Sequence, residues 1–401
     1  MRKHRPDFAI LLLVLALMGI GLVVIYAIGP RVAQYENSIN GGQLFSDNYY
    51  FAGQIRGIIF SLVAMLVGYF LPFEKLSKYS KVAFYIAAFL CFLTGALGRM
   101  GVTSFINCDE GACRAMRFPL IGSFQPAEIL KIASLLYGAY IIRSRKEKKL
   151  LHTSDFWVPV GVIMGVVAFV LAFLEKDFGS TVVIYTMMAA MIWVTCDLNW
   201  KEILAIIGIA IIGIVILILP FEHRRERLNI FSGEGDTYHI DNSLIGFGTG
   251  GLFGTGLGDS IQATGYLPEA PSDSIFSVVG EAWGFFGAML VLVVFIVLLA
   301  RIMGVSRRTQ DEEQSMVALG VFAWILAHVI INVGGVLALI PMKGITLPFL
   351  SHGGTSMLFV SFAIGLTLQI SRYTKREVIN EDSSSRRGER GTRYAGRRRR
   401  T

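Results

Sequence analysis

Two carboxylates, Glu269 and Asp273, follow a glycine-rich stretch between two apolar segments of this 401-residue chain. A carboxylate within hydrogen-bond reach of a hydroxyl can take its proton as a general base. The stretch reads GFGTGGLFGTGLG from Gly246 to Gly258, and glycine lets a backbone turn tightly and approach a ligand. An acid at membrane depth is costly unless it serves a function, so a reactive site is expected in the loop Gly246–Ile275. The alternative is an ordinary surface loop whose aspartate caps the next helix.

A second group of ionisable residues lies in the apolar segment that opens FQPAEILKIA. Pro126 suits the first turn of a helix, where its missing N–H has no cost. Glu128 and Lys131 stand three apart, so they share a helix face and can pair where the dielectric is low. The pair either lines an internal cavity or only fixes helix packing. Glu281, two helical turns beyond Asp273, also needs a partner, and Lys131 is the expected cation.

Several arginines could hold phosphate oxygens, because the guanidinium fork matches them. Arg114 and Arg117 precede the FQPAEILKIA segment, and a further cluster, RRER, occupies positions 224–227. That cluster either joins the phosphate site or lies against lipid headgroups. The charges at 175–177, within LEKDFG, form either a local ion network or part of the same site.

The last two apolar segments add polar groups at helical spacing. His328 and Asn332 are four apart and share a face, which favours hydrogen bonding between helices. Ser351, Gly353 and Gly354 lie in PFLSHGGTS, where backbone N–H groups at the start of the last helix could bind an anion.

The four cysteines fall into two pairs. Cys91 and Cys196 lie in or at the ends of apolar segments and are interpreted as small apolar fillers. Cys108 and Cys113 share the loop INCDEGACRAMR, which is expected outside the cell, where oxidation is allowed. They form either a short-loop disulfide or two free thiols.

Composition places the chain in a membrane, since 54% of residues are apolar and 16% are charged. Ten windows are apolar enough to cross a hydrocarbon core of about 30 Å. The first is too long for a cleaved signal peptide. The windows are Phe8–Ile28, Ala52–Pro72, Val82–Leu97, Pro126–Ile142, Trp157–Leu174, Thr181–Cys196, Ile203–Pro220, Ile275–Ala300, Met316–Ile340 and Thr355–Ile370.

The positive charges predict the orientation. Most Lys and Arg fall on the side of the N-terminal MRKHR, so both termini are expected in the cytoplasm and Phe221–Ser274 outside. The net charge of +8 then indicates topology and contact with anionic membrane lipids rather than nucleic-acid binding. The prediction is an all-α membrane domain of ten helices over residues 1–371, with a large outer loop between helices 7 and 8, and a basic, disordered cytoplasmic tail over residues 372–401.

Four blocks in this order resemble the SEDS family of FtsW, RodA and SpoVE: FQPAEILKIA, GFGTGGLFGTGLG, YLPEAPSDSIFSVVGEAWGFFG and LPFLSHGGTS. The resemblance covers most of the chain. It departs from the family pattern at Ala127 and His352, at Pro271, Ser272 and Ser274 beside the aspartate, and in the insertion that carries the paired cysteines.

The resemblance implies a peptidoglycan glycosyltransferase that polymerises lipid II at the outer face of the bacterial cytoplasmic membrane, for cell division, cell shape or sporulation. It implies a class B penicillin-binding protein as partner, with other division or elongation proteins beside it. Asp273 takes the place of the family's essential aspartate, and Glu128 and Lys131 match its charged positions. Diphosphate leaves readily once its charge is met by cations, whether side chains or Mg²⁺ or Mn²⁺. The alternatives are a lipid II flippase or carrier and an inactive scaffold for the partner synthase.

Overall fold

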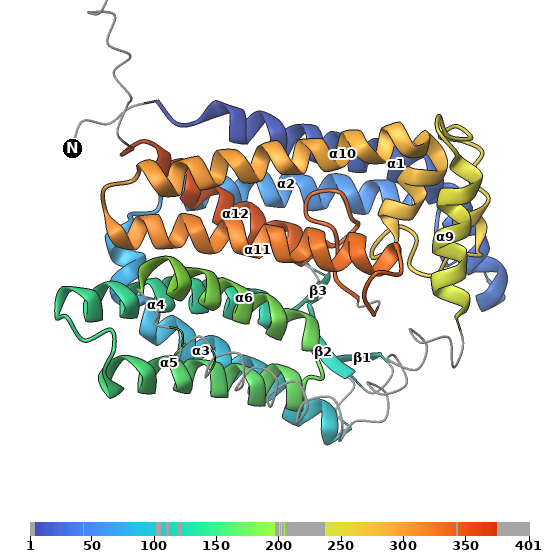
Figure 1. Ribbon diagram of the computed structural model, residues 1–401. Helices are drawn as coiled ribbons and strands as arrows, with labels where there is room; N and C mark the ends of the chain where they lie inside the picture. The colour runs from blue at the N-terminus through green and yellow to red at the C-terminus, as the bar shows by residue number, and fades with distance from the viewer. Residues whose placement is uncertain are drawn as a thin grey trace, which may run out of the picture.

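The computed structural model describes residues 5–42, 44–101, 106–109, 112–118, 122–196, 200, 202, 204, 237–341 and 344–374. The predicted seventh span, the 224–227 cluster and the tail beyond residue 374 lie outside these residues. The described helices form one bundle, in which most run side by side and α9 stands across one end (Figure 1). They are α1 (Phe8–Asn40), α2 (Tyr49–Phe70), α3 (Phe73–Arg99), α4 (Pro126–Glu147), α5 (Ser154–Val167), α6 (Phe178–Thr195), α9 (Tyr238–Gly250), α10 (Ile275–Arg308), α11 (Glu312–Val336) and α12 (Gly354–Ser371).

Seven of the described helices are long and apolar enough to cross a membrane: α1, α2, α3, α5 with its π-helical continuation η1 (Ala168–Leu174), α6, α10 and α11. The apolar α12 is shorter, and α4 carries ionisable residues inside the bundle. The predicted multi-pass membrane architecture is therefore confirmed, while ten remains the predicted number of spans.

Small residues allow α2 and α12 to pack backbone against backbone. A Cβ atom added at Gly68 would lie 2.4 Å from the carbonyl oxygen of Phe362, and one added at Gly365 would lie 2.1 Å from that of Met65. Without water between helices in a bilayer, such close approach supplies much of the attraction between them. The two glycines therefore fix the position of α12, and with it the segment that precedes α12.

One end of the bundle carries structure that the sequence did not predict. A three-stranded antiparallel sheet is formed by β1 (Ile106–Asp109), β2 (Ala112–Phe118) and β3 (Gly122–Phe124). Figure 1 shows this sheet and α9 at the end opposite the N-terminus, which we call the sheet end. The structure joins Cys108 and Cys113, which face each other across β1 and β2, in a disulfide.

The glycine-rich stretch is only partly a loop, which corrects the prediction. Its first five residues, from Gly246, complete helix α9, because Gly246 and Gly250 pack directly against Ser277 and Gly280 of α10. The remainder, up to the start of α10, contains only the short 3₁₀ helix η2 (Gln262–Thr264). Helix α10 also departs from a regular helix at Gly284, whose φ of 67° accommodates the backbone of Leu252 and Gly254.

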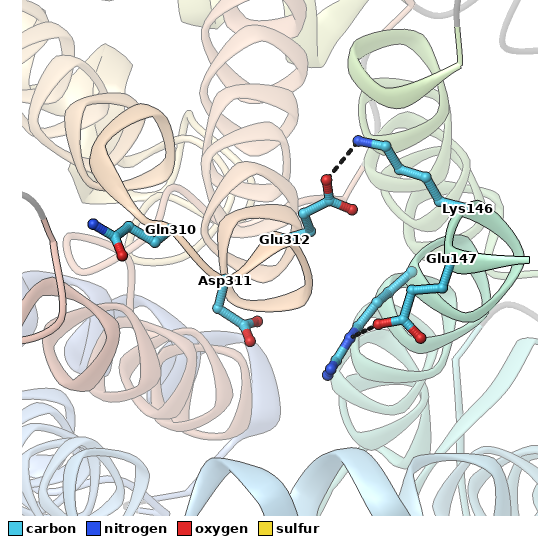
Figure 2. A pocket seen from close by; sticks show the side chains of 6 residues that line it. Lys146, Glu147, Gln310, Asp311 and Glu312 are labelled. Atoms are coloured by element: carbon cyan, nitrogen blue, oxygen red, sulfur yellow. Dashed lines mark hydrogen bonds and ion pairs between the residues drawn. The ribbon is translucent and has the colours of Figure 1, made fainter. Parts of the chain in front are cut away.

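Ion pairs connect α4 and α11 at the opposite end. Lys146 Nζ lies 2.7 Å from Glu312 Oε1, as Figure 2 shows, and Arg143 pairs with both Glu147 and Glu313 at 2.9 Å. A polar hollow of about 420 Å³ beside the α10–α11 turn is lined by Arg143, Lys146, Glu147, Gln310, Asp311 and Glu312. Glu313 is buried, whereas the side chains of Lys146, Glu147 and Glu312 are exposed. The Arg143–Glu313 pair therefore contributes most to holding the two helices together.

Candidate active site

Asp273 lies at the sheet end, one residue before the N-cap of α10. The residue is half-buried, and its carbonyl oxygen accepts a hydrogen bond from Asn332 Nδ2 at 2.7 Å. A Cβ atom at position 344 would lie 2.9 Å from Asp273 Oδ2, so Gly344 leaves room for the carboxylate. The carboxylate is thus held at the mouth of the bundle with part of its surface accessible. Since α10 begins at Ile275, Asp273 is not on the same helix as Glu281, contrary to the prediction.

A ladder of polar side chains on α11 holds this region in place. Asn332 Nδ2 donates a second hydrogen bond to the carbonyl of Ile345 at 2.8 Å. One turn away, His328 Nδ1 lies 3.1 Å from the carbonyl of Thr346, while His328 Nε2 accepts from Trp324 Nε1 at 3.1 Å. These two partners place the proton on Nδ1, because a carbonyl can only accept and an indole can only donate. His328 and Asn332 therefore bind backbone carbonyls, not another helix as predicted.

The Glu128–Lys131 pair lies behind the ladder. Lys131 Nζ is 2.8 Å from Glu128 Oε1, and the side chains are only 3% and 4% exposed. The ammonium also lies 5.7 Å from the ring centre of Trp324, within the range of a cation–π contact. The predicted pairing is present. Through Trp324 and His328 it connects to the segment beside Asp273.

Glu281 does not pair with Lys131, and that prediction is wrong. Its carboxylate accepts hydrogen bonds from the hydroxyl of Ser260 at 2.5 Å and from the backbone N–H groups of Ile261 and Gln262 at 2.8 and 3.2 Å. Backbone donors satisfy a buried carboxylate without a cation. The loop folds back over α10 and brings these donors to Glu281, so this residue shapes the loop rather than the charged cavity.

Glu269 is exposed and also shapes the loop. Its φ of 51° is unusual for a residue with a side chain and sets a tight turn. Its carbonyl accepts from the N–H groups of Ser272 and Ser274, and its carboxylate accepts from the Ser272 hydroxyl at 2.5 Å. Glu269 thus fixes the backbone that presents Asp273.

Arg114 lies beside the charged residues at 175–177. Arg114 is half-buried on β2 and donates to the carbonyl of Lys176 at 3.2 Å. Asp177 caps α6 through Ser180 N and accepts from Gln125 Nε2 at 2.9 Å. Glu175 is fully buried, and its burial, with the nearby Asp177 charge, raises its pKa well above the ordinary value. The structure describes the backbone of Arg117 but not its side chain, so its predicted role is not tested.

Ser351, Gly353 and Gly354 belong to a segment that enters the bundle between α11 and α12. Leu350 is fully buried, and its backbone lies against Gly21 of α1. The Ser351 hydroxyl accepts from the N–H of Leu347 at 2.8 Å, so it stabilises this turn. Gly353 is the N-cap of α12, with Gly354 as its first residue. Irregular backbone at this depth is tolerated because protein surrounds it.

Among the described residues, no three His, Cys, Asp or Glu side chains converge as a metal site would require. Asp273 and Glu269 offer oxygen ligands of the kind that Mg²⁺ and Mn²⁺ prefer, but their side chains do not complete such a site.

Trp324 is the site residue that the sequence analysis missed. It lies four residues before His328 and eight before Asn332, so the same helical face carries all three. The spacing was visible in the sequence. An apolar helix, however, carries many aromatic residues, and nothing local distinguishes the one that faces Lys131.

Residues 8–376 match the family described as cell cycle protein, which comprises FtsW, RodA and SpoVE. Stage V sporulation protein E of Bacillus subtilis is 32% identical over 390 residues, covering 93% of this chain and 99% of that protein. The probable peptidoglycan glycosyltransferase FtsW of Enterococcus hirae is 34% identical over 397 residues, covering 94% of each.

Two solved structures share the fold. A chain of a peptidoglycan synthase complex that coordinates polymerisation and crosslinking superposes with a TM-score of 0.72 at 22% identity, covering 92% of this chain and 98% of that one. RodA of Thermus thermophilus, a rod-shape-determining protein, superposes with a TM-score of 0.61 at 22% identity, with the same coverage.

Proposed function

This chain belongs to the FtsW, RodA and SpoVE family of peptidoglycan glycosyltransferases of cell-wall synthesis, and on that premise we propose that it polymerises lipid II with Asp273 as general base. The observation that supports this role most directly is the position of Asp273. The residue is half-buried at the sheet end, its backbone carbonyl is held by Asn332, and the absence of a side chain at Gly344 leaves room for its carboxylate.

In the proposed reaction, a sugar hydroxyl oxygen attacks the anomeric carbon of the donor. The new C–O bond forms as the bond from that carbon to the diphosphate oxygen breaks, and the diphosphate leaves with the bonding electron pair. The proton of the attacking hydroxyl passes to the Asp273 carboxylate. A glycosidase needs a second carboxyl as acid for a poor leaving group, whereas a diphosphate needs only positive charge around it.

Arg114 on β2 offers positive charge for the diphosphate at the sheet end, and its guanidinium suits phosphate oxygens. The charge of Lys131 is already met by Glu128 at 2.8 Å. Arg114 donates one of its N–H groups to Lys176, so the remaining donors are those that would meet phosphate.

The proposal includes location and partners. We propose that both termini lie in the cytoplasm and that the sheet end, with Asp273, faces outward from the bacterial cytoplasmic membrane; the distribution of positive charges supports this orientation. The likeness to a chain of a peptidoglycan synthase complex supports a class B penicillin-binding protein as the partner that crosslinks the strands.

The test is lipid II polymerisation by the purified protein with a partner whose own glycosyltransferase activity is excluded. Asp273→Asn should abolish glycan synthesis, because the amide cannot accept the proton, while partner binding persists. Glu269→Gln should retain more activity, because its backbone carbonyl, which holds the turn, is unchanged. Long glycan strands from the Asp273→Asn protein would refute the assignment. A carrier would continue to move lipid with Asp273 neutral, so the same variant distinguishes the two functions.

A further inference from the structure

A second hollow lies beside the loop that carries Asp273. It has a volume of about 340 Å³ and is bounded by the ends of α1 and α2, the start of α9 and the turn at Glu269. Its wall includes Pro271 and Ser272, the two residues that precede Asp273. Since consecutive Cα atoms are 3.8 Å apart, a ligand in this hollow would lie next to the proposed base.

The lining of this hollow has a consistent chemistry. Two carboxylates, Glu36 and Glu269, face it together with Tyr35, Tyr50 and Tyr238, and the described lining contains no Lys or Arg. The Tyr50 hydroxyl donates to Glu36 Oε1 at 2.5 Å, which fixes one carboxylate against one ring. Carboxylates beside aromatic faces are the arrangement that binds ammonium groups, whereas a diphosphate would be repelled.

His352 is a further residue in the lining of the hollow. Its ring lies edge-on to Tyr50, with ring centres 5.5 Å apart, and its backbone N–H donates to the carbonyl of Pro271 at 2.8 Å. Among the described residues its Nδ1 is buried without a hydrogen-bond partner. Burial and the nearby Arg56 lower its pKa, so the ring is neutral at pH 7 and adds an acceptor or donor rather than a competing charge.

We propose that this hollow is a substrate subsite that binds an ammonium group carried by the peptide of the disaccharide-peptide substrate. The inference rests on the proposed function and deepens it. The diphosphate would lie toward Arg114, and the anionic hollow would receive the peptide of the reacting unit. An ammonium bound at Glu36 would therefore orient the sugar hydroxyl toward Asp273, and an uncharged peptide side chain would be used less well.

The test compares two lipid II substrates, one with a free amine on the peptide side chain and one with that amine N-acetylated. Wild-type protein with its partner should use the free amine with a kcat/KM roughly tenfold higher, the scale of one hydrogen bond between charged groups. Glu36→Gln should reduce this ratio to about twofold or less. Tyr50→Phe, which keeps the ring but releases Glu36, should reduce it partly and serves if Glu36→Gln does not fold.

Asp47→Asn is the matched control. Asp47 is an exposed carboxylate near the start of α2, outside the lining of the hollow, so the same loss of charge should leave the ratio at its wild-type value. Equal use of both substrates by the wild type would overturn the proposal. The proposal would also be overturned if Glu36→Gln lowered kcat/KM equally for both substrates, because that result would indicate that Glu36 contacts sugar hydroxyls instead. If the wild type makes no glycan from either substrate, the proposed function fails and not only the subsite.

Discussion

Removing Lys131 should destabilise the protein because Glu128 would remain buried without its partner. The two side chains are 3% and 4% exposed, their N–O distance is 2.8 Å, and Glu128 Oε2 has no hydrogen-bond partner among the described residues. Lys131→Met keeps the length of the side chain and its contact with Trp324 while deleting the charge. Breaking a buried pair from one side costs about 3–5 kcal/mol.

The double variant separates the lost pair from lost packing. If Glu128→Leu is combined with Lys131→Met, no buried charge is left, and such replacements are often neutral or stabilising. The double variant should therefore lie within about 1–2 kcal/mol of the wild type. The two single variants should each be less stable than the double one, which requires a favourable coupling of at least about 4 kcal/mol between the two substitutions.

Reversible unfolding in mixed micelles, followed as a function of the denaturing detergent, measures these free energies, and polymerisation of lipid II is assayed on the same samples. A cost below about 1 kcal/mol for Lys131→Met, or additive costs in the double variant, would refute the reasoning, because either result means that Glu128 is not buried beside Lys131. A stable double variant that makes no glycan would show that the charges serve the reaction rather than the fold.

Two further predictions concern the placement of Asp273. Asn332→Leu deletes the hydrogen bonds to the carbonyls of Asp273 and Ile345. It should lower the free energy of unfolding by about 1–3 kcal/mol for each carbonyl left without a donor, and strongly reduce polymerisation. Wild-type turnover would contradict this prediction. Gly344→Ala places a methyl group 2.9 Å from Asp273 Oδ2, so turnover should fall while the unfolding free energy changes by less than about 1 kcal/mol. Gly248→Ala, which meets no atom within 4 Å, is its control and should retain full turnover.

The sequence alone determined the membrane character, most of the helices and the Glu128–Lys131 pair. All of these depend on local patterns: the length of an apolar run, a proline in a first turn, or two charges three residues apart on one helix. The position of Asp273 between a glycine-rich stretch and an apolar helix was likewise visible in the sequence, and so was its match to the family's essential aspartate.

The tertiary structure decided which distant groups meet. Glu281 was assigned to Lys131 because both needed a partner, but the loop brings Ser260 and two backbone N–H groups to that carboxylate instead. His328 and Asn332 were expected to bind another helix, yet they bind carbonyls of the segment before α12 and of Asp273. Helical spacing predicts which side chains share a face. It does not identify what packs against that face, because long-range packing decides which donors remain to be satisfied.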